Sequence, residues 1–91
     1  MNWKITFTKA AEEDLKWLRR HNKKLYVKCF DLLRDAMIDP RDGIGKPERL
    51  SNMKTEIWSR RIDSKNRLVY SILEENQEIV VSAFREHYSD H

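Results

Sequence analysis

The chain has a single cysteine, Cys29, so it cannot close an intrachain disulfide. Repeats, low-complexity tracts and linker-like segments are also absent. No apolar run approaches the roughly 20 residues that a membrane helix needs. The stretch Trp3–Phe7 alternates apolar and polar residues, unlike the continuous apolar stretch of a secretory signal. These absences predict a soluble protein of the reducing cytoplasm that makes no membrane contact, with Cys29 in a structural role.

The 91 residues are 40% hydrophobic and 36% charged, which is typical of a soluble globular domain. A chain of this length cannot build two cores, so residues 1–91 are expected to form one domain. The net charge of +3 says little, but residues 46–70 hold seven Lys or Arg against three Asp or Glu, a local balance of +4. Such a band near aromatic residues suits a polyanion, although from charge alone an ordinary solvated face is the commoner case.

Hydrophobic periodicity predicts an α+β fold with the element order βααβββ. Trp3–Phe7 is the first strand. A first helix follows the N-cap Thr8 and ends near His21, and a second follows the N-cap Asn22 and stops before Pro40. Helices joined this tightly form an antiparallel hairpin. Three further strands are predicted, at Ile57–Ile62, Arg67–Leu73 and Ile79–Phe84.

The helical hairpin should cover one face of an antiparallel sheet. Alternation turns a set of apolar side chains toward the helices, namely Trp58, Ile62, Leu68, Tyr70 and Ile72. Arg61 and Arg67 then fall on the opposite, open face. If the last strand is regular, Arg85 and His87 point the same way as Val81 and Ala83, but both faces of that strand are apolar and its parity stays open. Residues 41–55 are expected to form a long loop, either functional or disordered.

Three features carry chemistry: Glu48 in the long loop, Arg61 and Arg67 on adjacent strands, and the pair His87 and Tyr88 after the last strand. Together they are the parts needed to cleave RNA through its own 2′-hydroxyl. That reaction needs a base, a cation that stabilises charge on the phosphate, and an acid for the departing 5′-oxygen. A carboxylate is ionised at neutral pH, and an imidazole can hold a proton to donate. Each residue by itself is more often an ordinary surface residue.

Four segments in order resemble the YoeB/Txe toxins of bacterial toxin–antitoxin pairs, a branch of the RelE-like superfamily: Gly45–Leu50, Trp58–Ile62, Asn66–Tyr70 and His87–Tyr88. The run Trp-Ser-Arg-Arg-Ile with a terminal His-Tyr is specific, whereas the fold order is not. The helical hairpin also fits, so the resemblance covers essentially the whole chain. It implies a RelE-like microbial RNase fold and a ribosome-dependent endoribonuclease that cuts messenger RNA and inhibits translation.

Residue by residue, the resemblance implies that Glu48 is the general base, His87 the general acid and Arg67 the cation at the scissile phosphate. Arg61 matches a contact to the RNA backbone, and Tyr88 matches a residue that orients or stacks on the substrate. Relatives often carry a lysine where this chain has Ser51. Further substrate-binding charge is expected from Lys46, Arg49, Lys54 and Arg60, with Arg49 or Lys54 replacing that lysine.

The resemblance also implies three partners, which are a YefM/Axe-like antitoxin, a second copy in a homodimer, and messenger RNA in the A site of the small ribosomal subunit. The three histidines, His21, His87 and His91, lack metal-ligand spacing, so no metal or other cofactor is predicted. His91 belongs to a tail, residues 89–91, that relatives tend to lack. Two alternatives stay open. One is a toxin of the same fold acting on DNA gyrase, as ParE-type relatives do, and the other is a decayed module that only binds RNA or the antitoxin.

Overall fold

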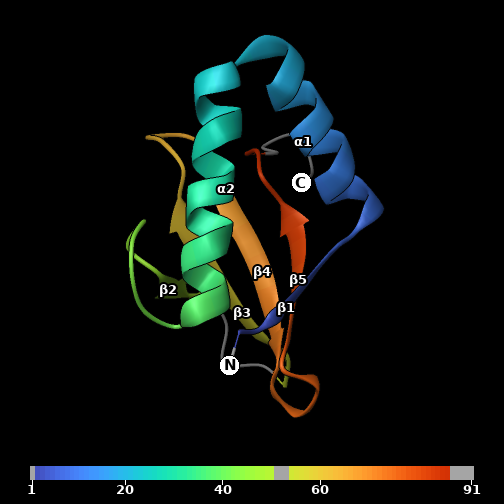
Figure 1. Ribbon diagram of the computed structural model, residues 1–91, viewed down its shortest axis with the longest axis vertical. Coiled ribbons are helices and arrows are strands. Elements are labelled where there is room, and N and C mark those ends of the chain that lie inside the picture. Colours follow the sequence, from blue (N-terminus) through green and yellow to red (C-terminus); the bar gives the residue numbers. More distant parts are fainter. Residues whose placement is uncertain (1, 51–53, 87–91) are drawn as a thin grey trace.

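The computed structural model describes residues 2–50 and 54–86. In these ranges it has five strands, two α-helices and a short 3-10 helix (Figure 1). Their order is β1 (Lys4–Phe7), α1 (Lys9–His21), α2 (Lys23–Ile38), β2 (Glu48–Arg49), β3 (Glu56–Arg61), β4 (Arg67–Leu73), η1 (Glu74–Asn76) and β5 (Glu78–Ala83). The α+β class and the order of the predicted elements are confirmed. Strand β2 is an addition, because it lies in the stretch predicted to be a loop.

Side-chain caps define both helices and the junction between them. The Thr8 hydroxyl accepts a hydrogen bond from Ala11 N–H (3.1 Å) at the start of α1. Asn22 serves both helices: its N–H donates to the Leu18 carbonyl (2.8 Å), and its Oδ1 accepts from Leu25 N–H (3.2 Å). The predicted antiparallel hairpin is therefore confirmed, with Asn22 as its one-residue connection.

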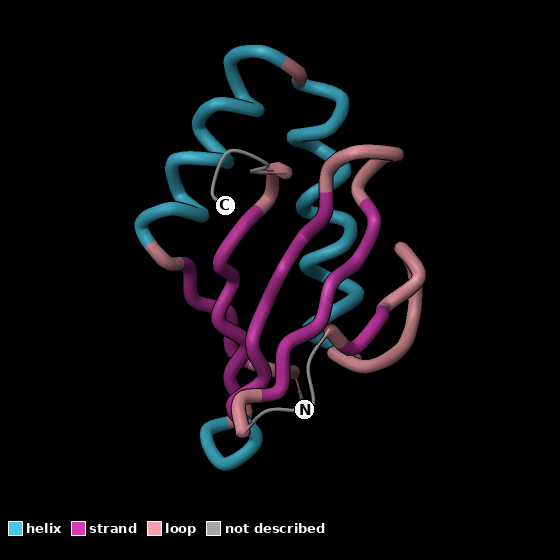
Figure 2. The backbone as a smooth tube through the Cα atoms, turned by 180° about the vertical axis from the view of Figure 1, so that it is seen from behind, coloured by secondary structure: helices cyan, strands magenta, loops and turns pink. Residues whose placement is uncertain are grey.

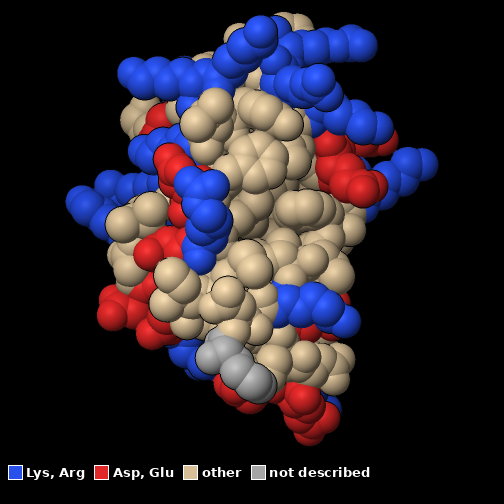
Figure 3. Space-filling model, viewed as in Figure 1, with Lys and Arg blue, Asp and Glu red and all other residues tan. Residues whose placement is uncertain are grey.

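The connected end of the hairpin is basic. Arg19 and Arg20 lie in the last turn of α1, and Lys23 and Lys24 begin α2, all of them exposed. Figure 3 shows Lys and Arg side chains gathered over this end of the helix-covered face. A second basic surface therefore exists apart from the band that the sequence singled out at residues 46–70.

The strands form one sheet in the order β1-β5-β4-β3-β2. Strands β2 to β5 run antiparallel to their neighbours, but β1 pairs with β5 in parallel, from Lys4 beside Glu78 to Phe7 beside Val81. The prediction of a purely antiparallel sheet was wrong for this pair. A short turn forces adjacent strands to be antiparallel. Strands β1 and β5 are instead joined through the rest of the fold, so their relative direction depends on how the hairpin packs.

Both helices cover one face of the sheet, and in the view from behind no helix of the described residues lies over the other face (Figure 2). Leu68, Tyr70 and Ile72 of β4 are buried toward the helices with Ile62, as alternation predicted. Cys29 of α2 is buried in the same cluster, and burial raises the pKa of its thiol to about 12. Within the described ranges, neither helix combines the length and apolar character needed to cross a membrane.

A β-bulge in β5 changes which of its residues face the helices. Val69 pairs with Ala83, but the next residue, Tyr70, pairs with Val81, so Ser82 is an extra residue in the ladder. Val81 is fully buried on the helix side, whereas Ala83 shares the open face with Val69. The regular alternation considered for this strand is therefore wrong, and Val81 and Ala83 point to opposite faces.

Candidate functional site

The open face of the sheet carries Glu48, Arg61 and Arg67. Arg61 of β3 pairs directly with Arg67 of β4, and Glu48 of β2 pairs with Ser59, two residues before Arg61. Paired residues, and alternate residues along a strand, point to the same face. Strand spacing puts the Cα atom of Glu48 about 8 Å from that of Arg61 and about 12 Å from that of Arg67. Side chains of this length can converge on one bound group.

Arg67 has one guanidinium nitrogen without a hydrogen-bond partner in the described part of the chain. Its Nη1 is buried and has no hydrogen-bond partner among the described residues. In the same part of the chain, no carboxylate forms an ion pair with Arg61 or Arg67. Like charges paired across two strands repel, and a buried donor without a partner costs about 1–3 kcal/mol, more when it is charged. An anion held between the two arginines would remove both penalties.

A shallow hollow of about 310 Å³ lies at this end of the open face. It is lined by Lys65, Arg67, Val69, Ala83, Arg85 and Glu86. The Arg85 guanidinium itself lies over the Trp17 ring of α1, so Lys65 and Arg67 supply the positive charge of the hollow. The bulge at Ser82 brings Ala83 to this side of the sheet. Strand alternation gives no signal for a bulge, so the sequence did not predict Ala83 as part of this surface.

Arg60 does not belong to the open face, which corrects its predicted role in substrate binding. The side chain is fully buried on the helix side. Its Nε donates to the Tyr70 hydroxyl (3.0 Å), Nη1 to the Asp35 carboxylate (2.6 Å) and the Ile44 carbonyl (3.1 Å), and Nη2 to the carbonyls of Asp39 (2.7 Å) and Asp42 (2.8 Å). A signal was present in the sequence, since Arg60 alternates in phase with Trp58 and Ile62, which were assigned to the helix side.

The Arg60 network fixes the loop between α2 and β2. Asp35 receives the Ile44 N–H (2.9 Å) and the Arg60 guanidinium, which together hold the pKa of its carboxyl below the usual range. Gly45 then brings the chain back to the sheet, where its carbonyl accepts from Arg61 N–H (2.6 Å). Its φ of +80° favours glycine, and a Cβ there would lie 2.8 Å from Leu32 Cδ2.

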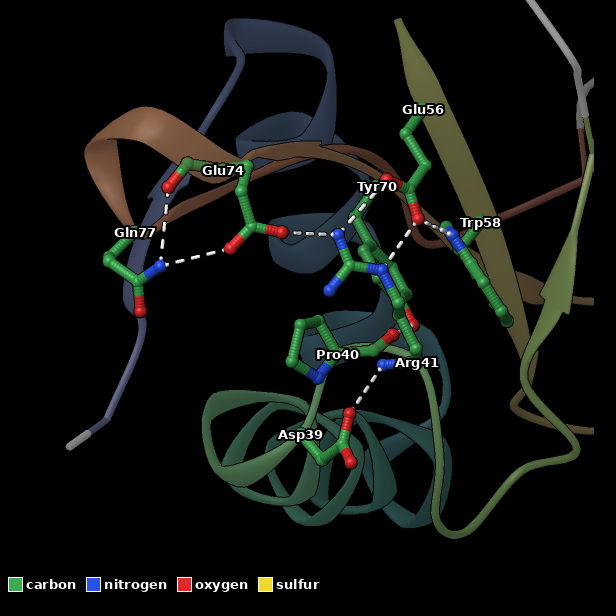
Figure 4. Close-up of polar contacts among 8 residues, drawn as sticks. All are labelled: Asp39, Pro40, Arg41, Glu56, Trp58, Tyr70, Glu74 and Gln77. Carbon is green, nitrogen blue, oxygen red and sulfur yellow. Dashed lines mark hydrogen bonds and ion pairs between the residues drawn. The ribbon is translucent and has the colours of Figure 1, made fainter.

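A second arginine, Arg41, ties the same loop to β3 and to the turn after β4 (Figure 4). Its Nε and Nη2 donate to the Glu56 carboxylate (2.7 and 3.0 Å), and Nη2 also donates to Glu74 (2.6 Å). Trp58 Nε1 donates to Glu56 as well (2.7 Å). The hydrogen bonds from Arg41 lower the pKa of Glu56 to about 2. The two arginine networks therefore present Glu48 on an anchored edge strand.

Arg49 and Lys54 also lie away from the open face. Arg49 pairs with Trp58, so its side chain points to the opposite face from Glu48. Lys54 lies at the other end of the sheet, in a hollow shared with the acidic turn before β5, roughly 20 Å along β4 from Arg67. Both residues are exposed, and the expectation that either supplies the charge of the missing family lysine stays a prediction.

The remaining predicted residues lie next to the site or outside the described ranges. Lys46 is exposed in the segment just before β2. His87 and Tyr88, like Ser51 and the tail 89–91, lie outside the described residues, so their roles stay predictions. Glu86, which precedes His87 directly, lines the hollow beside Arg67.

Comparison with known proteins gives a family match and several related structures. A family model described as YoeB-like toxin of bacterial type II toxin-antitoxin system matches residues 7–88. Toxin YoeB from Synechocystis sp. is 40% identical over 85 residues, which cover 93% of this chain and 96% of the relative. The solved structure of a YoeB dimer from Staphylococcus aureus is 37% identical and superposes with a TM-score of 0.82, covering 97% of this chain and 100% of that chain. A heterotetrameric YoeB-YefM toxin-antitoxin complex from the same organism contains a chain 35% identical, with a TM-score of 0.81 and the same coverage.

Proposed function

The chain belongs to the YoeB-like toxins of bacterial type II toxin–antitoxin systems, and we propose that it is a cytoplasmic endoribonuclease that cuts messenger RNA on the ribosome. The observation that carries this proposal is the buried Nη1 of Arg67, which has no partner among the described residues, on a face shared with Arg61 and Glu48. Such a guanidinium suits a phosphate oxygen. A carboxylate on the same face can accept the proton of a nearby hydroxyl.

In the proposed reaction the RNA supplies its own nucleophile. Glu48 takes the proton of a 2′-hydroxyl, a bond forms between the 2′-oxygen and the adjacent phosphorus, and the bond from phosphorus to the next 5′-oxygen breaks. His87 delivers a proton to that departing oxygen. Arg67 stabilises the charge on the non-bridging oxygens while Arg61 holds the backbone. The products are a 2′,3′-cyclic phosphate and a 5′-hydroxyl. No metal is required, because the nucleophile is already close to the phosphorus.

The surroundings of the site support dependence on the ribosome. The hollow is shallow, and Arg67 and Lys65 provide few phosphate contacts. Free RNA should therefore bind weakly and with strong salt dependence. The ribosome would instead hold the messenger in the A site of its small subunit, where Tyr88 would stack on a base and Lys46 would add general attraction. Cutting of naked RNA at physiological salt as fast as on ribosomes would contradict this part of the proposal.

Single-turnover cleavage on programmed ribosomes tests the assigned roles. We expect Glu48→Gln and His87→Gln each to slow cleavage by about 10²–10⁴, the usual range for general acid–base catalysis. Arg67→Ala should slow the chemical step by about 10²-fold or more through lost charge stabilisation. Glu75→Gln in the exposed η1 turn and His91→Gln in the tail are matched controls and should cut at the wild-type rate. Full-rate cutting by folded Glu48→Gln, or products with 5′-phosphate ends, would overturn the mechanism. Gyrase-dependent DNA damage in cells that express the protein would instead favour DNA gyrase as its target.

The proposal includes a protein partner of opposite charge. A YoeB toxin of Staphylococcus aureus forms a complex with YefM and has also been solved as a dimer. Arg61 and Arg67 of the open face should attract an acidic antitoxin segment that folds on binding and blocks the site. Co-expression with the neighbouring small acidic open reading frame should suppress toxicity. A neighbour that neither binds nor protects would remove this part of the proposal. Sedimentation of the purified toxin would report whether it forms a homodimer.

A further inference from the structure

Three consecutive residues after β5 are each held by a side chain from another element. Phe84 N–H donates to the carboxylate of Asp14 in α1 (3.0 Å), and both residues are buried. The Arg85 guanidinium lies 3.7 Å from the centre of the Trp17 ring. Glu86 N–H donates to Oδ1 of Asn66 in the turn between β3 and β4 (3.1 Å). The three contacts come from both layers of the fold.

These contacts replace the strand ladder where it ends. The last pairing of β5 with β4 is Val69 beside Ala83, so residues 84–86 have no strand partner in the described ladder. Each of the two hydrogen bonds stabilises the segment, and the one to the charged Asp14 carboxylate is the stronger. The cation over an aromatic face stabilises it further. Residues 84–86 are therefore fixed where the end of a strand would ordinarily fray.

Asn66 is itself held firmly in the turn. The Asp63 carboxylate accepts from the backbone N–H groups of Asn66 (2.6 Å) and Lys65 (2.8 Å). The Asn66 carbonyl accepts from Ile62 N–H (2.9 Å). On the side chain, Nδ2 points toward Asp63 Oδ2 at 3.4 Å, which leaves Oδ1 as the acceptor for Glu86. Both the backbone and the amide of Asn66 are thus oriented before Glu86 binds.

We infer that Asn66 is a positioning residue of the proposed active site, which holds the strand end that leads to His87 at a set distance from Arg67. The geometry is direct, because Arg67 follows Asn66 in the chain and His87 follows Glu86. One hydrogen bond therefore ties together the residue before the phosphate-binding arginine and the residue before the proposed acid. Both Arg67 and Glu86 line the same hollow. The inference rests on the proposed function and adds a residue that does not itself touch the substrate.

The test is a double-mutant cycle on programmed ribosomes. Misplacement of a reacting group by about 1 Å can cost about 10²-fold in rate, so Asn66→Ala should slow single-turnover cleavage by about 10- to 100-fold. The protein concentration that gives half the maximal rate should change less than about two-fold, because Asn66 makes no substrate contact. In a His87→Gln background the same substitution should have almost no effect. Asn76→Ala, an exposed asparagine in the turn before β5, is the matched control and should cut normally.

Equal slowing by Asn66→Ala in both backgrounds would overturn the inference, because a general loss of structure acts regardless of the acid. All variants are compared at a temperature where circular dichroism shows them folded. If Asn66→Ala does not fold, Asn66→Gln keeps the amide but displaces its oxygen by one methylene, and the same coupling to His87 is expected.

Hydrogen exchange of the Glu86 backbone amide, measured without ribosomes, tests the hydrogen bond from Glu86 N–H to Asn66 Oδ1 independently. It should accelerate at least ten-fold in Asn66→Ala, and unchanged exchange would also overturn the inference. If His87→Gln alone cuts at the full rate, the proposed function loses its acid. The exchange result still reports whether Asn66 holds the strand end.

Discussion

Single substitutions of Arg60 and of Arg61 by methionine should have different effects. The first should lower the stability of the fold, and the second should lower the proposed activity. Arg60 is fully buried and makes five hydrogen bonds. Arg61 is exposed at the end of the same strand. Methionine approximates the length of arginine but has neither the charge nor the donors. We expect Arg60→Met to destabilise the fold and Arg61→Met to remove only a surface cation.

The size of the Arg60 effect follows from what the substitution leaves behind. Asp35 loses its cationic partner, and Tyr70 and three backbone carbonyls lose a donor. Removing one partner of a buried ion pair costs about 3–5 kcal/mol. The Asp35 side chain is 29% exposed, so water can solvate it in part and the lower figure, about 3 kcal/mol, applies. At about 4–8 °C per kcal/mol for a domain of this size, Tm should fall by about 12–24 °C.

Urea unfolding followed by circular dichroism measures both variants under one condition. Arg61→Met should stay within about 0.5 kcal/mol of the wild type, while its cleavage on ribosomes slows about ten-fold or more through one lost charge-assisted contact. An Arg60→Met protein with the wild-type urea midpoint would refute the structural role of Arg60. A loss above about 1 kcal/mol in Arg61→Met would refute the placement of Arg61 as an exposed surface residue.

Two further predictions concern groups with shifted pKa values. The pKa of Glu56 falls from 4.5 to about 2 through its bonds with Arg41, so its stabilising effect is complete above pH about 4.5 and is lost as the pH falls through 2. Glu56→Gln should therefore lower the free energy of unfolding by about 1–3 kcal/mol at pH 7 and by much less at pH 2; equal losses at both pH values in urea titrations would contradict this. The pKa of Cys29, raised by burial to about 12, predicts that a thiol-specific reagent labels the native protein at least about 100-fold more slowly than the urea-unfolded protein. Rapid labelling of native protein would contradict the burial of this thiol.

Local patterns predicted the elements that depend on local physics. Thr8 and Asn22 cap the helices through bonds to residues three positions away, so a short stretch of sequence contains the whole signal. The alternation of Leu68, Tyr70 and Ile72 similarly gave the inner face of β4. Strand β2, with only Glu48 and Arg49, is too short to show alternation and was predicted as loop.

The structure bears on the arrangement of the predicted site residues. Glu48, Arg61 and Arg67 were predicted to act together, and strand pairing places them on one face. Charge was also assigned to the site from sequence position alone, which wrongly included the buried Arg60. A local net charge does not say to which face each side chain points. The Arg60 guanidinium donates hydrogen bonds to a partly buried carboxylate and to four other acceptors. None of these acceptors is adjacent to Arg60 in the sequence.

The sequence by itself determined the helical hairpin, the inner faces of the strands and the segments that resemble the toxin family, because caps, periodicity and motifs act over a few neighbouring residues. Only the tertiary structure decided the parallel pairing of β1 with β5, the bulge at Ser82 and the hydrogen bond between Glu86 and Asn66. Each of these depends on which distant segments meet once the hairpin covers the sheet. The free energy of such contacts comes from packing two layers together, and no short stretch of the chain contains both partners.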